Sequence, residues 1–267
     1  MFNDAKNFRL DIGGKTMDCI SFGRGEKALI LIPGVGDGLK TVEGTAFPFS
    51  VMYRKLAKRY RVYAFSRINN LPDGYTTRDM AKDTSAAMDA LGIKSAYIVG
   101  VSQGGMIAQY LAIDHPEKVE KLILCVTLSR PNGVVTDVVN RWIEMAKKSD
   151  YAGIMMDTAE RSYSEKYLKK ARAMYGLVSK MGKPDSFERF IIQARSCITH
   201  DAYDELSAIS CPTLIIGGSE DKIVSPEASL EINERIKGSE LKMYDGLGHG
   251  TYEEAKDFLD RIISFCG

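Results

Sequence analysis

Apolar runs of strand length alternate with longer segments of helical period along most of this chain, and this alternation limits its possible folds more than any other feature. The apolar runs lie at 28–32, 61–65, 96–101 and 121–127, and helical patterns lie between them at 49–58, 77–91 and 103–114. A strand, a helix and a second strand in succession form a right-handed crossover that joins parallel strands. We therefore expect an α/β fold with a doubly wound, mostly parallel sheet.

A predicted hairpin precedes the alternation of strands and helices, and one long segment interrupts it. Two short strands around Gly13-Gly14 predict a hairpin before the parallel strands. From Arg130 to Leu206 the alternation stops, and Met, Tyr, Lys and Arg recur at helical spacing without a buried strand. The alternation then resumes with strands at 213–216 and 241–244 and helices at 226–236 and 253–265. We predict one core formed by residues 1–129 and 207–267, with a helical cap at 130–206 inserted after the sixth strand.

Composition excludes several classes of partner and cofactor. Lys and Arg total 36 against 35 acidic residues, and no dense basic run is present, so we expect no nucleic acid partner. The longest apolar runs have strand length, so we expect no membrane span. No apolar stretch preceded by positive charge begins the chain, which favours the cytoplasm. The five cysteines are scattered and never form CxxC, so we predict reduced thiols and neither a metal site nor a cofactor.

The strongest local signal is a GxSxG motif between a strand and a helix. It reads Gly100-Val-Ser102-Gln-Gly104. A serine on so tight a turn has a strained backbone, and glycines are needed where neighbouring backbone passes closely. The hydroxyl then stands clear of the sheet, at the helix end that favours an anion. Ser102 is therefore the candidate nucleophile, and the alternative is an ordinary N-cap serine in a glycine-rich turn.

A serine hydroxyl needs a neighbouring base to attack at neutral pH, and the chain has three histidines. His115 lies at the far end of the helix that follows Ser102, about 20 Å away at a rise of 1.5 Å per residue. His200 lies in the cap or at its exit and suits a surface or pocket-lining role better than catalysis. His249 follows the last predicted strand, at the sheet edge that carries Ser102. His249 is therefore the candidate base.

The acid that would orient this histidine is predicted on a neighbouring loop. A carboxylate beside a catalytic histidine fixes its tautomer and stabilises its charged form. Asp221 follows Gly217-Gly218 directly after the strand at 213–216, at the same sheet edge. Glu220 is the alternative acid, and a solvated pair of loop carboxylates is the other interpretation.

The glycine-rich loop after the strand at 28–32 is the candidate for stabilising an oxyanion. The backbone N–H of Gln103 lies next to the nucleophile, and we expect a second donor in the N–H of Val35. Gly34 lets this loop approach the site. Phosphate binding is the alternative, but no Lys-Ser or Lys-Thr follows at P-loop spacing.

Together, the stretches LILIPGVGDG, VGVSQGGMIAQY, CPTLIIGGSEDKIV and GLGHG make the chain resemble the α/β-hydrolase superfamily. The resemblance is to small capped members such as carboxylesterases, proline iminopeptidase-like enzymes and carbon–carbon bond hydrolases. It implies cofactor-free acyl chemistry by a triad in the chain order Ser102, Asp221, His249. It also implies a small-molecule acyl substrate bound between cap and core.

Two loops depart from the pattern of that superfamily. Pro33-Gly34 stands where many relatives carry His-Gly, which keeps the backbone donor but removes an imidazole. Ser66-Arg67 and the three residues after them replace the common Asp-x-Arg-Gly-x-Gly. The contribution of this second loop to a pocket is left open.

Pliable and aromatic side chains in the cap suit an acyl or aromatic substrate. We predict that Trp142, Met145 and Met156 line the pocket together with Gly34. The further apolar cap residues are Met155, Tyr163, Tyr167, Met174, Tyr175 and Met181. Residues at such spacings alternatively hold a helical cap on its own domain.

The predicted activity is hydrolysis of a carboxylic ester through an acyl-enzyme. One alternative is a carbon–carbon bond hydrolase or an aminopeptidase on the same triad. For the peptidase, Asp157, Glu160 and Glu165 could hold a substrate amine. The other alternative is a ligand-binding receptor on this scaffold without turnover.

Overall fold

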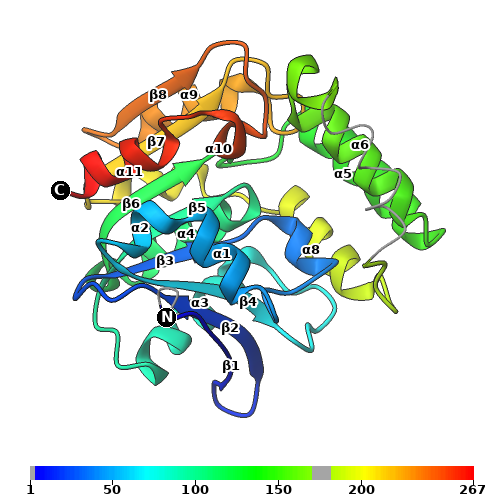
Figure 1. The fold of residues 1–267 in the computed structure, drawn as a ribbon. Coiled ribbons are helices and arrows are strands. Elements are labelled where there is room, and N and C mark those ends of the chain that lie inside the picture. The colour runs from blue at the N-terminus through cyan, green and yellow to red at the C-terminus, as the bar shows by residue number, and fades with distance from the viewer. Residues whose placement is uncertain (1–3, 170–181) are drawn as a thin grey trace.

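The computed structural model describes residues 4–169 and 182–267, and in this part of the chain eight strands form one sheet (Figure 1). The strands are β1 Lys6–Asp11, β2 Thr16–Phe22, β3 Ala28–Ile32, β4 Arg61–Ile68, β5 Ala96–Val101, β6 Val119–Cys125, β7 Thr213–Gly218 and β8 Glu240–Tyr244. Their order is β1-β2-β4-β3-β5-β6-β7-β8. Strands β3 to β8 pair in parallel, and the hairpin β1–β2 pairs antiparallel at one edge. The predicted fold class is confirmed.

Helices cover both faces of the sheet, which explains the uninterrupted apolar run of β3. On one face lie α1 Ala46–Met52, α2 Arg54–Ala57 and α11 Phe258–Cys266; on the other lie α3 Thr77–Ala90, α4 Gln103–Asp114 and α9 Pro226–Arg235. Leu29 and Leu31 belong to the core cluster of the first face, and Ile30 and Ile32 to that of the second. Strands buried on both faces need apolar residues at every position. No helix within the described ranges is long and apolar enough to cross a membrane.

Two predicted helices are each divided in the structure. The pattern at 49–58 corresponds to α1 and α2, which are separated at Tyr53. The pattern at 253–265 corresponds to α10 Thr251–Glu254 and α11, separated by Ala255 in an extended conformation. Helical periodicity continues across both breaks because the residues on either side face the same core.

Helices lie between β6 and β7, as the predicted insertion requires. They are α5 Gly133–Lys147, α6 Tyr151–Ser162 and α8 Glu188–Ile198, followed by the 3-10 helix η3 Tyr203–Ala208. Their apolar side chains form one cluster with Met106 in the first turn of α4 and with Ile223 and Val224 after β7. The inserted helices therefore pack against the edge where the parallel strands end (Figure 1). The cap boundaries at 130 and 206 stay a prediction.

Candidate active site

Ser102 occupies a strained turn between β5 and α4. Its φ of 55° and ψ of −121° place it in a region that residues with side chains rarely adopt. The Ser102 N–H donates to the carbonyl of Cys125 at 2.9 Å, and its own carbonyl accepts from Gly105 N–H and Thr127 Oγ1, both at 2.8 Å. Neighbouring strands and the start of α4 therefore hold the turn in place.

The glycines of the motif are required by close backbone contacts. A Cβ on Gly104 would lie 1.9 Å from the carbonyl oxygen of Ile32, and one on Gly100 would lie 2.4 Å from the carbonyl oxygen of Gly104. A Cβ on Gly34 would lie 3.3 Å from Cβ of Ser102. The loop after β3 thus passes directly beside the serine, as the sequence predicts.

His249 and Asp221 form a hydrogen-bonded pair. Nδ1 of His249 lies 2.8 Å from Oδ2 of Asp221, and both residues are buried. Oδ1 of Asp221 accepts from the N–H groups of Ile223 and Val224 at 2.9 and 3.0 Å. Burial opposes ionisation of Asp221, but His249 and the two amides outweigh it and lower the pKa of the carboxyl below 3.8. An ionised Asp221 requires the proton on Nδ1, which leaves Nε2 of a neutral imidazole as an acceptor. Glu220, the alternative acid, is exposed.

Ser102 and the Asp221–His249 pair lie at the same edge of the sheet. Strands β5, β6, β7 and β8 are parallel neighbours, so the loops after them leave on one side. A cavity bordered by Gly34 is also bordered by Tyr252, three residues after His249. Within the described residues no hydrogen bond joins Ser102 to His249, and such bonds are often long until substrate binds. The triad stays a prediction.

The two expected oxyanion donors each begin a helix. Val35 starts the 3-10 helix η1 Val35–Gly38, and Gln103 starts α4. The first N–H groups of a helix have no acceptor within it, so both can bind an external oxygen. Their assignment also stays a prediction.

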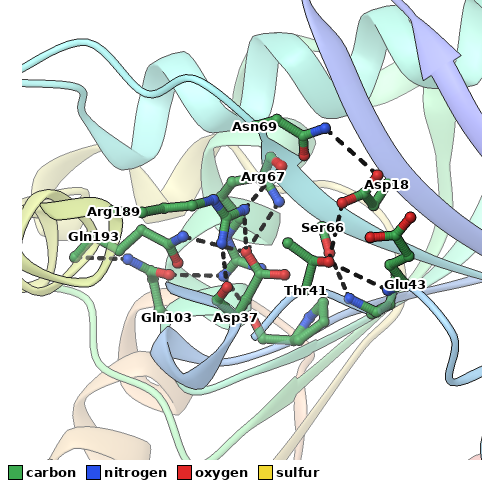
Figure 2. A network of polar contacts seen from close by, with 12 residues as sticks. Asp18, Asp37, Thr41, Glu43, Ser66, Arg67, Asn69, Gln103, Arg189 and Gln193 are labelled. Carbon is green, nitrogen blue, oxygen red and sulfur yellow. Dashed lines mark hydrogen bonds and ion pairs between the residues drawn. The ribbon is translucent and has the colours of Figure 1, made fainter. Parts of the chain in front are cut away.

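A buried polar network joins η1 to the cap (Figure 2). Oδ2 of Asp37 accepts from Nη2 of Arg189 at 2.7 Å, from Nε2 of Gln193 at 3.2 Å and from the backbone N–H of Arg67 at 3.2 Å. Asp37 and Arg67 are 4% and 3% exposed, so this is an ion cluster inside the protein. Two cations surround one carboxylate.

The same network reaches the nucleophile turn through Arg67. Nη2 of Arg67 donates to the carbonyl of Pro33 and, at 2.8 Å, to Oε1 of Gln103. Nε2 of Gln103 donates to the carbonyl of Gln193 at 2.7 Å and to Oγ of Ser196 at 3.0 Å, both on α8. The Gln103 side chain, next to Ser102, is therefore bonded to both core and cap.

The charged side chains of this cluster stay ionised at neutral pH. Burial opposes ionisation of Asp37, but Arg189 and then Arg67 outweigh it and lower the pKa of the carboxyl below 3.8. Burial lowers the pKa of Arg67 to about 10, so the guanidinium is still positive at neutral pH. The role of this loop could not be assigned from the sequence, although an arginine directly after the run VYAFS was a visible signal.

Comparison with known proteins supports the resemblance to α/β hydrolases. The family described as alpha/beta hydrolase fold matches residues 27–152. The chain is 25% identical to a putative carbamate hydrolase of Caulobacter over 90% of each chain. It is 26% identical to 2-hydroxymuconate semialdehyde hydrolase of Pseudomonas putida, over 71% of this chain and 68% of that one. The enol-lactonase structure from Burkholderia xenovorans superposes with a TM-score of 0.82 at 19% identity, covering 97% of this chain and 99% of that one. The chain has the α/β-hydrolase fold, and its sequence is similar to hydrolases of that fold.

The residues predicted to line the pocket have different surroundings. Trp142 is buried in the cluster between cap and core, and its Nε1 donates to Asp157 at 2.9 Å. Met145 packs at the margin of that cluster, whereas Met156 is 52% exposed. Gly34 borders both Ser102 and a cavity. Their role as pocket lining stays a prediction; Met174, Tyr175 and Met181 lie outside the described residues.

The other two histidines are placed away from this chemistry. His115 ends α4, as predicted. The surface role expected for His200 is wrong: it is 1% exposed, with Thr77 Oγ1 at 2.9 Å and Gln109 Oε1 at 3.3 Å from its ring nitrogens. Burial lowers the pKa of His200 to about 3, so the ring is neutral at pH 7.

We predict that His200 makes the protein less stable as the solution is acidified. The unfolded chain protonates this ring below pH 6.5, whereas the folded chain resists protonation until about pH 3. Its contribution is complete above pH 6.5 and falls by about 1.4 kcal/mol per pH unit between those values. Urea unfolding of wild type and His200→Gln between pH 7.5 and 4.5 measures this. The variant should show the shallower dependence, and equal slopes would contradict the assignment.

Proposed function

We propose that this chain is a serine hydrolase that cleaves a carboxylic ester through an acyl-enzyme. The observation that carries the proposal is the strained Ser102 turn at the same sheet edge as the bonded Asp221–His249 pair. Oγ of Ser102 attacks the ester carbonyl while its proton passes to Nε2 of His249. The N–H groups of Val35 and Gln103 would bind the resulting oxyanion.

The second half of the reaction uses the same groups. The tetrahedral intermediate expels the alcohol, which takes the proton from the imidazolium of His249. Water then attacks the acyl-enzyme, gives a proton to His249, and the acid leaves as Ser102 regains its proton. Asp221 stays ionised throughout and stabilises the charged imidazole.

An apolar acyl group is the substrate part that the surroundings of Gly34 favour. Gly34 borders a cavity of about 280 Å³ that is lined mainly by apolar side chains, including Leu31, Val101, Phe49 and Phe258. An outer cavity of about 430 Å³ shares Met52, Tyr53, Tyr252, Glu253 and Phe258 with it. Apolar walls beside a nucleophile are suited to a hydrocarbon chain.

Carbon–carbon bond hydrolysis is the second candidate because a curated relative is named 2-hydroxymuconate semialdehyde hydrolase. The aminopeptidase alternative has less support. Asp157, one of the acids that could hold an amine, is already paired with Arg141 at 3.1 Å and Arg161 at 2.8 Å and bonded to Trp142. A receptor without turnover would keep the pocket and lose the reaction.

The cytoplasm is the proposed location. All five cysteines are free thiols, and four are buried. Disulfide bonds form mainly in oxidising compartments, so unpaired cysteines suit a reducing one.

Replacing Ser102 tests the reaction class. Ser102→Ala should lower kcat/KM for p-nitrophenyl esters by about a thousandfold or more, because the attacking oxygen is removed. Ser264→Ala, an exposed serine on α11, is the matched control and should retain activity. Assays of prolyl p-nitroanilide and a vinylogous 1,5-diketone beside the esters separate the alternatives. Full ester turnover by Ser102→Ala would rule out the mechanism, and Ser102 labelling by a fluorophosphonate without any turnover would favour the receptor.

Narrowing the cavity should change the preferred acyl chain. Met52 lines both cavities, so Met52→Trp should lower kcat/KM for octanoyl esters while acetyl esters are still cleaved. Phe47→Trp makes a comparable change on the same helix at a residue outside either lining. An unchanged chain-length profile in Met52→Trp would place the acyl group elsewhere.

A further inference from the structure

The two proposed oxyanion donors belong to separate segments of backbone. Val35 follows β3, whereas Gln103 follows β5, and almost seventy residues of chain separate them. An oxyanion hole works when its donors are already aimed at the position where charge develops. Errors of about 1 Å in such positions can lower a rate by about a hundredfold. Pairing of β3 with β5 places the two segments side by side, and a further contact is needed to fix the loops beyond these strand ends.

One nitrogen atom is hydrogen-bonded to both segments. Nη2 of Arg67 donates both to the carbonyl of Pro33, two residues before Val35, and to the side chain of Gln103 (Figure 2). The contact with Pro33 fixes the direction of the peptide that enters the oxyanion loop. The contact with Gln103 fixes the side chain of the residue that supplies the other donor. A guanidinium suits this position because its donors are planar and rigid, whereas a lysine is a point charge on a flexible stem.

Both donor segments are also bonded to the cap helix α8. Asp37, two residues after Val35, pairs with Arg189, which also donates to the carbonyl of Arg67 at 2.9 Å. The side-chain amide of Gln103 donates to the carbonyl of Gln193. The cap helix is therefore bonded to both donor segments and to the arginine between them.

Stability alone is a weak reason for such a cluster. Removing two arginines and an aspartate from water is costly, and pairing often does no more than offset that cost. Within the described residues, Nε and Nη1 of Arg67 have no hydrogen-bond partner, so the pairing is also incomplete. One positive charge is left in excess, and that charge favours an anion forming nearby.

We infer that Arg67 is a positioning residue for the oxyanion hole, which ties the Val35 and Gln103 segments together and links both to α8. The inference rests on the proposed function, because it concerns the hole used in that reaction. Disturbing this link should lower the affinity of the site for the transition state more than its affinity for the substrate.

Two variants test the link, and one matched control accompanies them. Arg67→Lys keeps the charge and shortens the side chain. Gln103→Met keeps the backbone donor and removes the side-chain amide without touching a buried charge. Gln109→Met is the control, because Gln109 is also fully buried on α4 but bonds to Leu128 and His200 instead. Active sites are counted by fluorophosphonate titration, so that loss of folded protein does not appear as loss of kcat.

The expected result is a split between kcat and KM. Arg67→Lys and Gln103→Met should lower kcat per titrated site about ten- to a hundredfold, with KM within about threefold of wild type. The inhibition constant of a trifluoromethyl ketone, whose adduct carries an oxyanion, should rise by the factor by which kcat/KM falls. Gln109→Met should lower the unfolding midpoint and leave kcat per site unchanged.

Two outcomes would overturn the inference. If both variants keep wild-type kcat per site and wild-type affinity for the ketone, the network is only structural. If wild-type enzyme neither reacts with the fluorophosphonate nor cleaves esters, the proposed function fails and the inference falls with it. The wild-type measurement therefore separates the two failures.

Discussion

The strained backbone of Ser102 is the constraint on which the rest of the site depends. A residue in such a conformation costs about 1–3 kcal/mol and persists only where its surroundings fix it. Here the turn is fixed by the carbonyl of Cys125, by the hydroxyl of Thr127 and by glycines packed against backbone with no room for a Cβ. The same turn sets the direction of the Ser102 hydroxyl and of the next N–H, so nucleophile and donor are positioned together.

The cap is bonded to the loops of the site at two places. On one side α8 pairs with Asp37 and accepts from Gln103. On the other side the carbonyl at the end of α6, Ser162, accepts from Gly250 next to His249 at 2.7 Å, and Ser164 donates to Glu254. The inserted helices thus contact the segments of both the candidate nucleophile and the candidate base. We interpret the cap as part of the framework of the site as well as its cover.

Much of this arrangement could be predicted from the sequence because it depends on local pattern. Apolar runs identified the strands, and GxSxG between strand and helix located the turn that carries Ser102. The sequence could not show that the backbone N–H of Arg67 donates to Asp37 and its guanidinium to Gln103, because partners 30 and 36 residues apart meet only through the fold. Likewise, His200 is buried because Thr77 and Gln109 satisfy its ring, and nothing near it in sequence indicates those contacts. Periodicity reveals which face a residue occupies, but not which polar group it meets there.

In the proposed mechanism a serine, an imidazole held by a carboxylate, and two backbone N–H groups converge on one reacting carbon. A crystal structure of the protein after reaction with a fluorophosphonate tests this most directly. We expect phosphorus bonded to Oγ of Ser102, a phosphoryl oxygen within hydrogen-bond distance of the Val35 and Gln103 N–H groups, and Nε2 of His249 facing the adduct. A phosphorus atom on another residue, or a phosphoryl oxygen turned away from both amides, would contradict it.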